Sequence, residues 1–267
     1  MKSIELARKA RIHAVQMVHN ARASHIASAL SIIDIMSVLY QSTLNVFAAE
    51  PDHPDRDRFI LSKGHACVGV YAILAECGFF PKELLLTYGQ NGSILMNHIS
   101  HKVPGVEFST GSLGHGLPFG VGKALVAKKR NLFWRTYVLM SDGEMQEGSN
   151  WEALMFASHH KLDNLVAIID FNNLQSLTTV DRTLNIQPLN EKLKAFGWHV
   201  IEVAGHDHDA LDKCFKDAIL VKKTPTAIIA KTTKGKGVSF MENKVDWHYK
   251  SSSSEELEIA INEIENA

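Results

Sequence analysis

The segment SDGEMQEGSNWEALMFASHHKLDNLVAIIDFNNLQ, residues 141–175, decides how the rest of the chain is read. An apolar run, residues 136–140, leads into it, and Asp142 follows after a single serine. A second apolar run, residues 165–169, is followed by Asn172. With a helical stretch between the runs, this is a strand–helix–strand unit. In parallel α/β sheets such units place ligands at the carboxyl ends of the strands.

Apolar runs and helical stretches alternate along the rest of the chain as well. Further strands are predicted at residues 59–61, 198–203 and 226–230, and helices at residues 3–22, 31–40, 66–77, 151–160, 190–196, 206–223, from Pro118 onward and in the tail 251–267. This order predicts an α/β fold, a parallel sheet covered by helices on both faces. No linker rich in proline, glycine and serine interrupts it, so we expect residues 1–267 to form a single domain.

The start of the second predicted helix carries a polar pair. Ser31 and Asp34 have the spacing of a capping box, with aspartate in place of the usual glutamate. This pair predicts that the helix begins at Ser31, after a loop of small residues, 22–28.

Residues 88–122 differ in character from the rest of the chain. They are rich in glycine, histidine, serine and asparagine, and no periodicity runs through them. A long irregular segment inside a compact domain is usually functional. Its core, residues 109–117, leads into the helix predicted near Pro118, and small residues at such a start let backbone N–H groups approach a ligand.

Composition excludes several classes of function. The net charge of −1 favours neither nucleic acid nor an anionic membrane as a partner. The three cysteines are scattered, which is typical of a reducing compartment. The amino terminus lacks the apolar core of a signal peptide, and no run is long enough to span a membrane. We therefore expect a cytoplasmic protein.

The polar residues at the two strand ends predict a metal site. Asp142 offers a carboxylate oxygen, Asn172 an amide oxygen, and the turn after it a carbonyl, most simply that of Leu174. Such oxygen donors suit Mg²⁺ or Ca²⁺ rather than zinc, and Mg²⁺ commonly completes its shell with phosphate oxygens. Each segment could also be a plain turn. Their position at the strand ends of one unit favours a diphosphate site, while the motifs of P-loop and dinucleotide-binding proteins are missing.

The segment 141–175 resembles the thiamine-diphosphate motif, in which G-D-G is followed one βαβ unit later by N-N. It is more closely similar to the transketolase version, GDGExQEGxxWEAxxxAxxxxLxNLxxxxDxNxxQ. Other transketolase-like motifs are DRFILSKGH at 57–65, PGVE at 104–107, TGSLGHGL at 110–117, and KGKGV at 234–238 followed by Trp247 and His248. The resemblance therefore extends over nearly the whole chain.

The resemblance implies a thiamine-diphosphate-binding domain of the PP type. Transketolases carry two further domains after this one, and a glutamate in the second activates the aminopyrimidine of the cofactor. We therefore expect this chain to be the N-terminal subunit of a split transketolase, with a partner chain that supplies the Pyr and C-terminal domains in an α2β2 assembly. The reaction would be transfer of a two-carbon ketol unit from a ketose or its phosphate to an aldose or its phosphate.

The resemblance also implies roles for individual residues. Mg²⁺, replaceable by Ca²⁺ or Mn²⁺, would be held by Asp142, Asn172 and the carbonyl of Leu174. The cofactor would be bound by His65, Leu113, Gly114, His115, Asp142, Gly143, Glu144, Asn172 and His248. Histidines at the reacting carbonyl and the sugar oxygens would be His25, His65, His98 and His248, where they can donate hydrogen bonds and carry protons. Glu147 and Glu152 match glutamates of the dimer interface.

The chain departs from the family pattern around its histidines. The family's GHPGxxLS, GHPE, LGQG and WHG are replaced by residues 24–31, 97–100, 113–116 and 247–249, and the first glycine of GDG is Ser141. Every histidine is kept, but two prolines and a glutamate beside them are lost. These changes would reshape the sugar channel, so an unusual ketose or aldehyde substrate is expected.

Two other hypotheses stay open at this point. The chain could be the α-subunit of a different thiamine enzyme, such as a 2-oxo-acid decarboxylating component or a deoxyxylulose-phosphate-synthase-like protein. The KGKG and SKGH motifs disfavour this reading. It could also be a cofactor-binding half without catalytic function, although a bare binding module would not need the kept histidines.

Overall fold

A five-stranded parallel sheet forms the centre of the computed structural model, which describes residues 1–267. Its strands are β1 (Arg58–Leu61), β2 (Thr136–Ser141), β3 (Leu165–Phe171), β4 (His199–Ala204) and β5 (Thr226–Lys231). The order across the sheet is β1-β2-β3-β5-β4, and every neighbouring pair is parallel. The predicted α/β class is confirmed.

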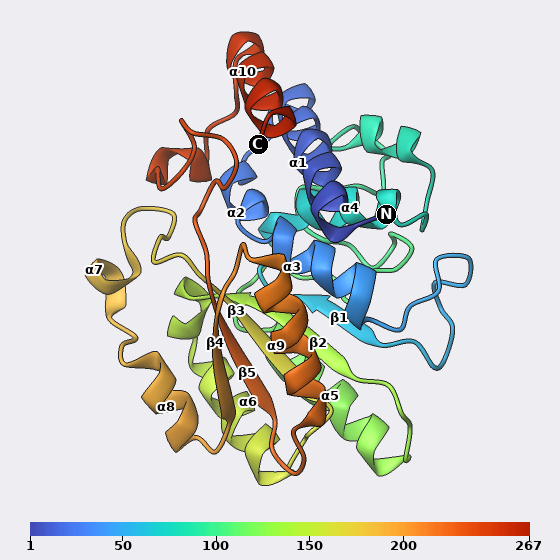
Figure 1. Ribbon diagram of the computed structural model, residues 1–267, viewed down its shortest axis with the longest axis vertical. Coiled ribbons are helices and arrows are strands. Elements are labelled where there is room, and N and C mark those ends of the chain that lie inside the picture. Colours follow the sequence, from blue (N-terminus) through green and yellow to red (C-terminus); the bar gives the residue numbers. More distant parts are fainter.

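Helices surround this sheet (Figure 1). The α-helices are α1 (Ser3–Asn20), α2 (Ile26–Leu30), α3 (Ile33–Val38), α4 (Cys67–Glu76), α5 (Gly116–Lys129), α6 (Gly148–His159), α7 (Val180–Leu184), α8 (Leu189–Ala195), α9 (His208–Leu220) and α10 (Ser254–Glu265). Short 3-10 or π turns occupy Leu39–Thr43, Gly64–Ala66, Lys82–Thr87, Gly143–Gln146 and Val245–His248. None of the helices combines the length and apolarity needed to cross a membrane.

Alternate residues of the central strands enter two different cores. On β2, Tyr137 and Leu139 belong to the larger core, which includes residues of α1, α3, α4 and α9. Val138 and Met140 belong to the smaller core, formed with α5, α6 and α8. Because successive strand side chains point to opposite faces, a strand apolar on both faces must be covered on both. The predicted covering of both faces is confirmed.

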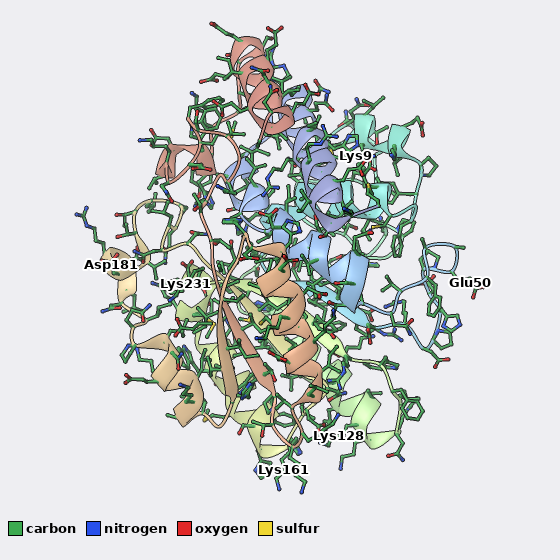
Figure 2. The ribbon with its side chains drawn as sticks, viewed as in Figure 1. Lys9, Glu50, Lys128, Lys161, Asp181 and Lys231 are labelled. Atoms are coloured by element: carbon green, nitrogen blue, oxygen red, sulfur yellow. The ribbon has the colours of Figure 1, made fainter.

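The two ends of the sheet carry different structures. Lys128 and Lys161 lie together at the end of the molecule where the strands begin, whereas Lys231 lies at the carboxyl end of β5 (Figure 2). The chain continues from β5 toward the end of the molecule where α1 and α10 pack together (Figure 1). The loops that leave the strands therefore meet α2 and the segment that precedes α10.

The prediction that a helix starts at Ser31 is wrong. A helix already begins at Ile26, and α3 begins at Ile33, with neither start capped by a side chain. The hydroxyl of Ser31 lies 2.6 Å from Oδ2 of Asp170 and 3.0 Å from the Ser28 carbonyl, two acceptors for its one hydrogen. Asp34 turns toward α1 and the loop after β4 instead of capping the helix. Long-range partners thus replace the local capping box.

Candidate functional site

A cavity of about 330 Å³ opens at the carboxyl ends of the strands. It is formed by loops that lie far apart in the sequence, as expected for a parallel sheet. Nine of the residues singled out from the sequence line it: His25, His65, His98, Leu113, Gly143, Glu147, Asn172, Leu174 and His248. The geometry therefore brings the histidines and the oxygen donors of the predicted site together.

Five other residues singled out from the sequence do not line this cavity. Asp142 is fully buried between Ser141 and Gly143, which both line the cavity. Gly114 and Glu144 are also buried, whereas His115 and Glu152 are exposed. The Nδ1 atom of His115 bonds to the Leu113 carbonyl.

Four imidazole rings form one wall of the cavity. The ring centroid of His25 lies 5.1 Å from that of His65, 5.9 Å from that of His98 and 4.9 Å from that of His248. The rings of His65 and His248 are 5.5 Å apart. His25 is therefore the centre of the cluster.

Three of these imidazoles are neutral at physiological pH. Burial, followed by the proximity of His98, lowers the pKa of His25 to about 4. Burial and Lys234 lower the pKa of His248 to about 3. Burial and Lys63 hold the pKa of His65 well below its usual range. A neutral imidazole can donate through one ring nitrogen and accept through the other, so the cluster can pass protons in either direction.

His25 adopts a left-handed backbone conformation, with φ of 70°. This region is unfavourable for a residue with a side chain, and such strain concentrates at functional sites. The N–H of His25 donates to the His248 carbonyl at 2.8 Å, and its Nδ1 bonds to the Ser24 hydroxyl at 2.9 Å. The first bond fixes the loop before α2 against the segment that precedes α10, and the second orients the His25 ring within its own loop.

Oxygen donors gather beside the cavity at the ends of β2 and β3. The carboxylate of Asp142 accepts the N–H groups of Gly143 and Asn173. Asn172 donates through Nδ2 to Asp170 at 3.0 Å and accepts the Leu174 N–H through Oδ1 at 3.0 Å. The two bonds fix the orientation of the amide: its Nδ2 faces Asp170, and its Oδ1 faces the backbone of Leu174.

This donor set fits a hard divalent cation. No three His, Cys, Asp or Glu side chains come together as a metal cluster. Mg²⁺ needs no such cluster, since one carboxylate with neutral oxygens and phosphate is a common set for it. Burial, reinforced by Asp170, raises the pKa of Asp142 to about 7, so a cation beside it would stabilise its ionised form.

Two buried lysines in the site were not assigned a role from the sequence. Lys63, at the exit of β1, forms an ion pair with Asp170 at 2.6 Å and donates to the Ser28 carbonyl at 2.9 Å. Lys234, in the loop after β5, lies 3.0 Å from both the Gln175 carbonyl and Nδ1 of His248. Burial and Lys63 lower the pKa of Lys234 to about 8. Both side chains line the cavity, which gives it two cationic groups.

Glu144 ties the glycine-rich loop to the strand ends. Its carboxylate accepts the hydroxyl of Ser62, the N–H of Gly114 at 2.9 Å and the N–H of Ser141 at 3.3 Å. Gly114 has φ of 77°, and a Cβ there would lie 2.6 Å from the Ser149 hydroxyl, so only glycine fits. Glu144 thus acts on the cavity through the loop that carries Leu113.

The remaining lining residues were also missed. They are Ser28, Gly111, Ser141, Gln146, Gln175, Ser176 and Tyr249. Their position in the sequence could have identified them, because most of them directly follow a predicted strand or belong to a motif already quoted. Tyr249 replaces the glycine of the family's WHG, and its ring lies 4.7 Å from that of His248 and 5.7 Å from that of His25.

Comparison with known proteins gives a consistent family match. Residues 3–263 match the family described as "Transketolase, thiamine diphosphate binding domain". The chain is 41% identical over 265 residues to one subunit of the apulose-4-phosphate transketolase of Phocaeicola vulgatus, covering 99% of this chain and 94% of that one. It is 42% identical to the equally named protein from Actinobacillus succinogenes, covering 91% of this chain and 88% of that one.

Full-length transketolases match as well, but over part of their length. The human transketolase is 41% identical over 97% of this chain and 41% of its own length. The crystal structure of the Campylobacter jejuni enzyme superposes with a TM-score of 0.93 and 32% identity, covering 98% of this chain and 42% of that one. The chain thus spans about two fifths of these relatives. The resemblance drawn from the sequence motifs is confirmed, and the chain belongs to the transketolase family, where it corresponds to the thiamine-diphosphate-binding domain.

Proposed function

We propose that this chain is the diphosphate-binding subunit of a two-chain, thiamine-diphosphate- and Mg²⁺-dependent transketolase. The observation that carries the proposal is the cavity itself, because neutral imidazoles and the oxygen donors Asn172 and Leu174 line the same space. A protein that only stored the cofactor would need the oxygen donors but not the imidazoles.

The diphosphate end is assigned to the strand exits. Asp142, Asn172 and the Leu174 carbonyl would hold Mg²⁺, with Ca²⁺ or Mn²⁺ as substitutes. The N–H of Gly143 donates to Asp142, so the cationic side chains of Lys63 and Lys234 are the stronger candidates to face the phosphates. A Cβ on residue 143 would approach Gln175 to 3.0 Å, and its absence leaves room for a ligand.

The other end of the cofactor is assigned to the glycine-rich loop. Leu113 lines the cavity, and Gly114 and His115 follow it in the loop that the Glu144 carboxylate holds. An aminopyrimidine ring would pack against Leu113 there. The group that activates this ring would come from a partner chain.

The histidines are assigned to the sugar. Bound thiamine diphosphate supplies an electron sink for cleavage of the C–C bond beside a ketose carbonyl. His25, His65 and His248 are neutral, so each can donate a hydrogen bond to a sugar oxygen and exchange a proton with it. His98 lies across from His25 and would bind a hydroxyl further along the sugar.

The names of two relatives support a substrate and a two-chain assembly to test. Both are named as one subunit of an apulose-4-phosphate transketolase, and this chain spans most of their length. We therefore propose a phosphorylated ketose as donor, with apulose 4-phosphate as the first compound to test. A partner chain with the Pyr and C-terminal domains would complete an α2β2 assembly, in which Glu147 and Glu152 lie at the subunit interface.

The test combines purification and activity. The chain is produced together with its candidate partner. Ketol transfer is then measured from apulose 4-phosphate to glyceraldehyde 3-phosphate and from xylulose 5-phosphate to ribose 5-phosphate. Transfer should require both chains, thiamine diphosphate and Mg²⁺. Decarboxylation of a 2-oxo acid by the same pair would contradict the proposal.

A further inference from the structure

A cluster of titratable side chains outside the cavity meets at Asp34. The guanidinium of Arg11 donates to both carboxylate oxygens, at 2.9 Å for Oδ1. Nδ1 of His206 lies 2.7 Å from Oδ2, and Nε2 of His208 lies 3.0 Å from Oδ1. Asp34 is 4% exposed, so all of its charge is balanced inside the protein.

Hydrogen bonds define the protonation of His206. The backbone N–H of Thr233 donates to its Nε2 at 2.7 Å. An acceptor nitrogen carries no hydrogen, so the ring hydrogen is on Nδ1 and points at Asp34. Asp34 therefore orients the ring, and the ring accepts from the loop that follows β5.

The same cluster holds that loop at a second point. Nε of Arg11 donates to the Lys236 carbonyl at 3.2 Å. The loop, residues 232–237, is thus held at Thr233 by His206 and at Lys236 by Arg11. The cluster lines a second cavity of about 330 Å³ together with Lys236 and Gly237 of the loop, whereas Lys234 lines the first cavity.

We propose that His206 is a positioning residue, which fixes the 232–237 loop through Thr233 and thereby sets Lys234 at the diphosphate end of the site. The role assigned to Lys234 rests on the proposed function, whereas the grip on the loop does not. Thr232 is held by the Phe171 carbonyl and Gly235 by the Ala27 carbonyl. The bond to His206 falls between these two anchors, immediately before Lys234.

The chain offers a matched control in His208. This residue also bonds to Asp34, but its other nitrogen bonds to the Ser3 hydroxyl at 2.8 Å rather than to the loop. His208→Ala should therefore remove a partner of Asp34 without releasing Thr233. His206→Ala removes a partner of Asp34 and also releases Thr233.

Two conservative variants separate the two bonds of His206. In His206→Gln the amide oxygen can take the place of Nε2 and accept from Thr233. In His206→Asn the shorter amide can donate to Asp34 but leaves the Thr233 N–H unpaired. A purely structural role through Asp34 would favour Asn, and the positioning role favours Gln.

The first measurement needs no cofactor. Hydrogen exchange of residues 232–237 is followed in the folded chain, and His206→Ala and His206→Asn should exchange about tenfold faster than His206→Gln and His208→Ala. Nitrogen NMR of the wild-type His206 ring provides a check that does not depend on any variant folding. An Nε2–H tautomer would overturn the proposal.

The second measurement is the dissociation constant of thiamine diphosphate with Mg²⁺ and the partner chain. His206→Ala and His206→Asn should bind about tenfold more weakly. His206→Gln and His208→Ala should stay within about twofold of wild type, and kcat should recover at saturating cofactor. Equal losses in His206→Asn and His208→Ala would overturn the inference. A wild-type pair that binds no cofactor would instead overturn the proposed function, while exchange and NMR would still test the grip of His206.

Discussion

Asp34 and Asp142 are both buried beside loops that leave the sheet, yet their pKa values move in opposite directions. Burial, reinforced by Asp170, raises the pKa of Asp142 to about 7. Burial acts on Asp34 in the same sense, but Arg11 and two histidines outweigh it and hold its pKa well below the usual range. The two carboxylates differ in the partners that the fold provides.

The partners explain what each region does. Asp34 contacts a guanidinium and two imidazoles from three elements, so its charge is balanced by the chain. Asp142 contacts only backbone N–H groups, and no cation of the chain forms an ion pair with it. A buried carboxylate left in this state favours a cation from outside. The region around Asp34 therefore supports the fold, and the region around Asp142 is built for a ligand.

The largest expected effect is on stability. Asp34→Asn should lower the free energy of unfolding by about 3–5 kcal/mol, because it leaves Arg11 buried without its counter-charge. Without metal, Asp142→Asn should change it by less than about 1 kcal/mol, since the lost backbone bond is offset by relief of repulsion from Asp170. Urea unfolding in the presence of a chelator measures both. Equal losses of unfolding free energy in the two variants would contradict the proposed difference between the two regions.

For cofactor affinity, unlike stability, the region around Asp142 should matter more than the region around Asp34. Asp142→Ala should weaken Mg²⁺-dependent binding of thiamine diphosphate by about 100-fold, because the site loses its only carboxylate ligand. Asp181→Ala is the control, since this exposed carboxylate on α7 is not among the residues that line the cavity and lies at the outer edge of the molecule in Figure 2. Calorimetry with the partner chain present measures both constants. Unchanged affinity in Asp142→Ala would remove Mg²⁺ from the proposed site.

A smaller effect is expected from the geometry of the Asp34 cluster. Arg11→Lys keeps the charge but loses the two-pronged contact and the bond to Lys236, which should cost about 1–2 kcal/mol of stability. Arg8→Lys, on the exposed side of the same helix, should cost almost nothing. Thermal unfolding of the two variants tests this. An Arg11→Lys variant as stable as the wild type would mean that the positive charge alone holds Asp34.

The smallest expected change is in the pH dependence of Asp34. Its pKa in the folded chain lies below the unfolded value of about 3.9, so its stabilisation is fully present above that value and is lost as the pH falls through the folded pKa. The stability gap between wild type and Asp34→Asn should therefore not narrow from pH 8 to pH 5, and should close only below about pH 4. Unfolding curves across this range measure it, and narrowing near pH 6 would contradict a lowered pKa.

Local pattern was sufficient for most of the fold. The five predicted strands lie within a residue or two of β1–β5, because runs that are apolar on both faces have no stable place except a sheet covered on both sides. The same pattern misplaced the helix start at Ser31. There the capping spacing was present, but Asp34 bonds instead to Arg11 and His206, which lie far away in the chain, and these bonds outweigh one local bond.

The site was predicted in part for a similar reason. Asp142 and Asn172 could be found because they follow strands of one unit. Lys63 and Lys234 stood in quoted motifs, yet nothing local indicates that their ammonium groups reach the same cavity. Glu144 was assigned to the cofactor, whereas its carboxylate is wholly engaged by the protein and acts through the glycine-rich loop.

The sequence by itself determined the class of fold, the strand ends that carry oxygen donors and the transketolase family, since these depend on periodicity and on short contiguous motifs. Only the tertiary structure decided that β5 lies between β3 and β4, that four histidines from separate loops surround one cavity, and that Asp34 meets His206 across 172 residues. The physical reason is that the period of apolar residues shows which face of a helix or strand is buried. Which other element covers that face depends on packing over the whole chain.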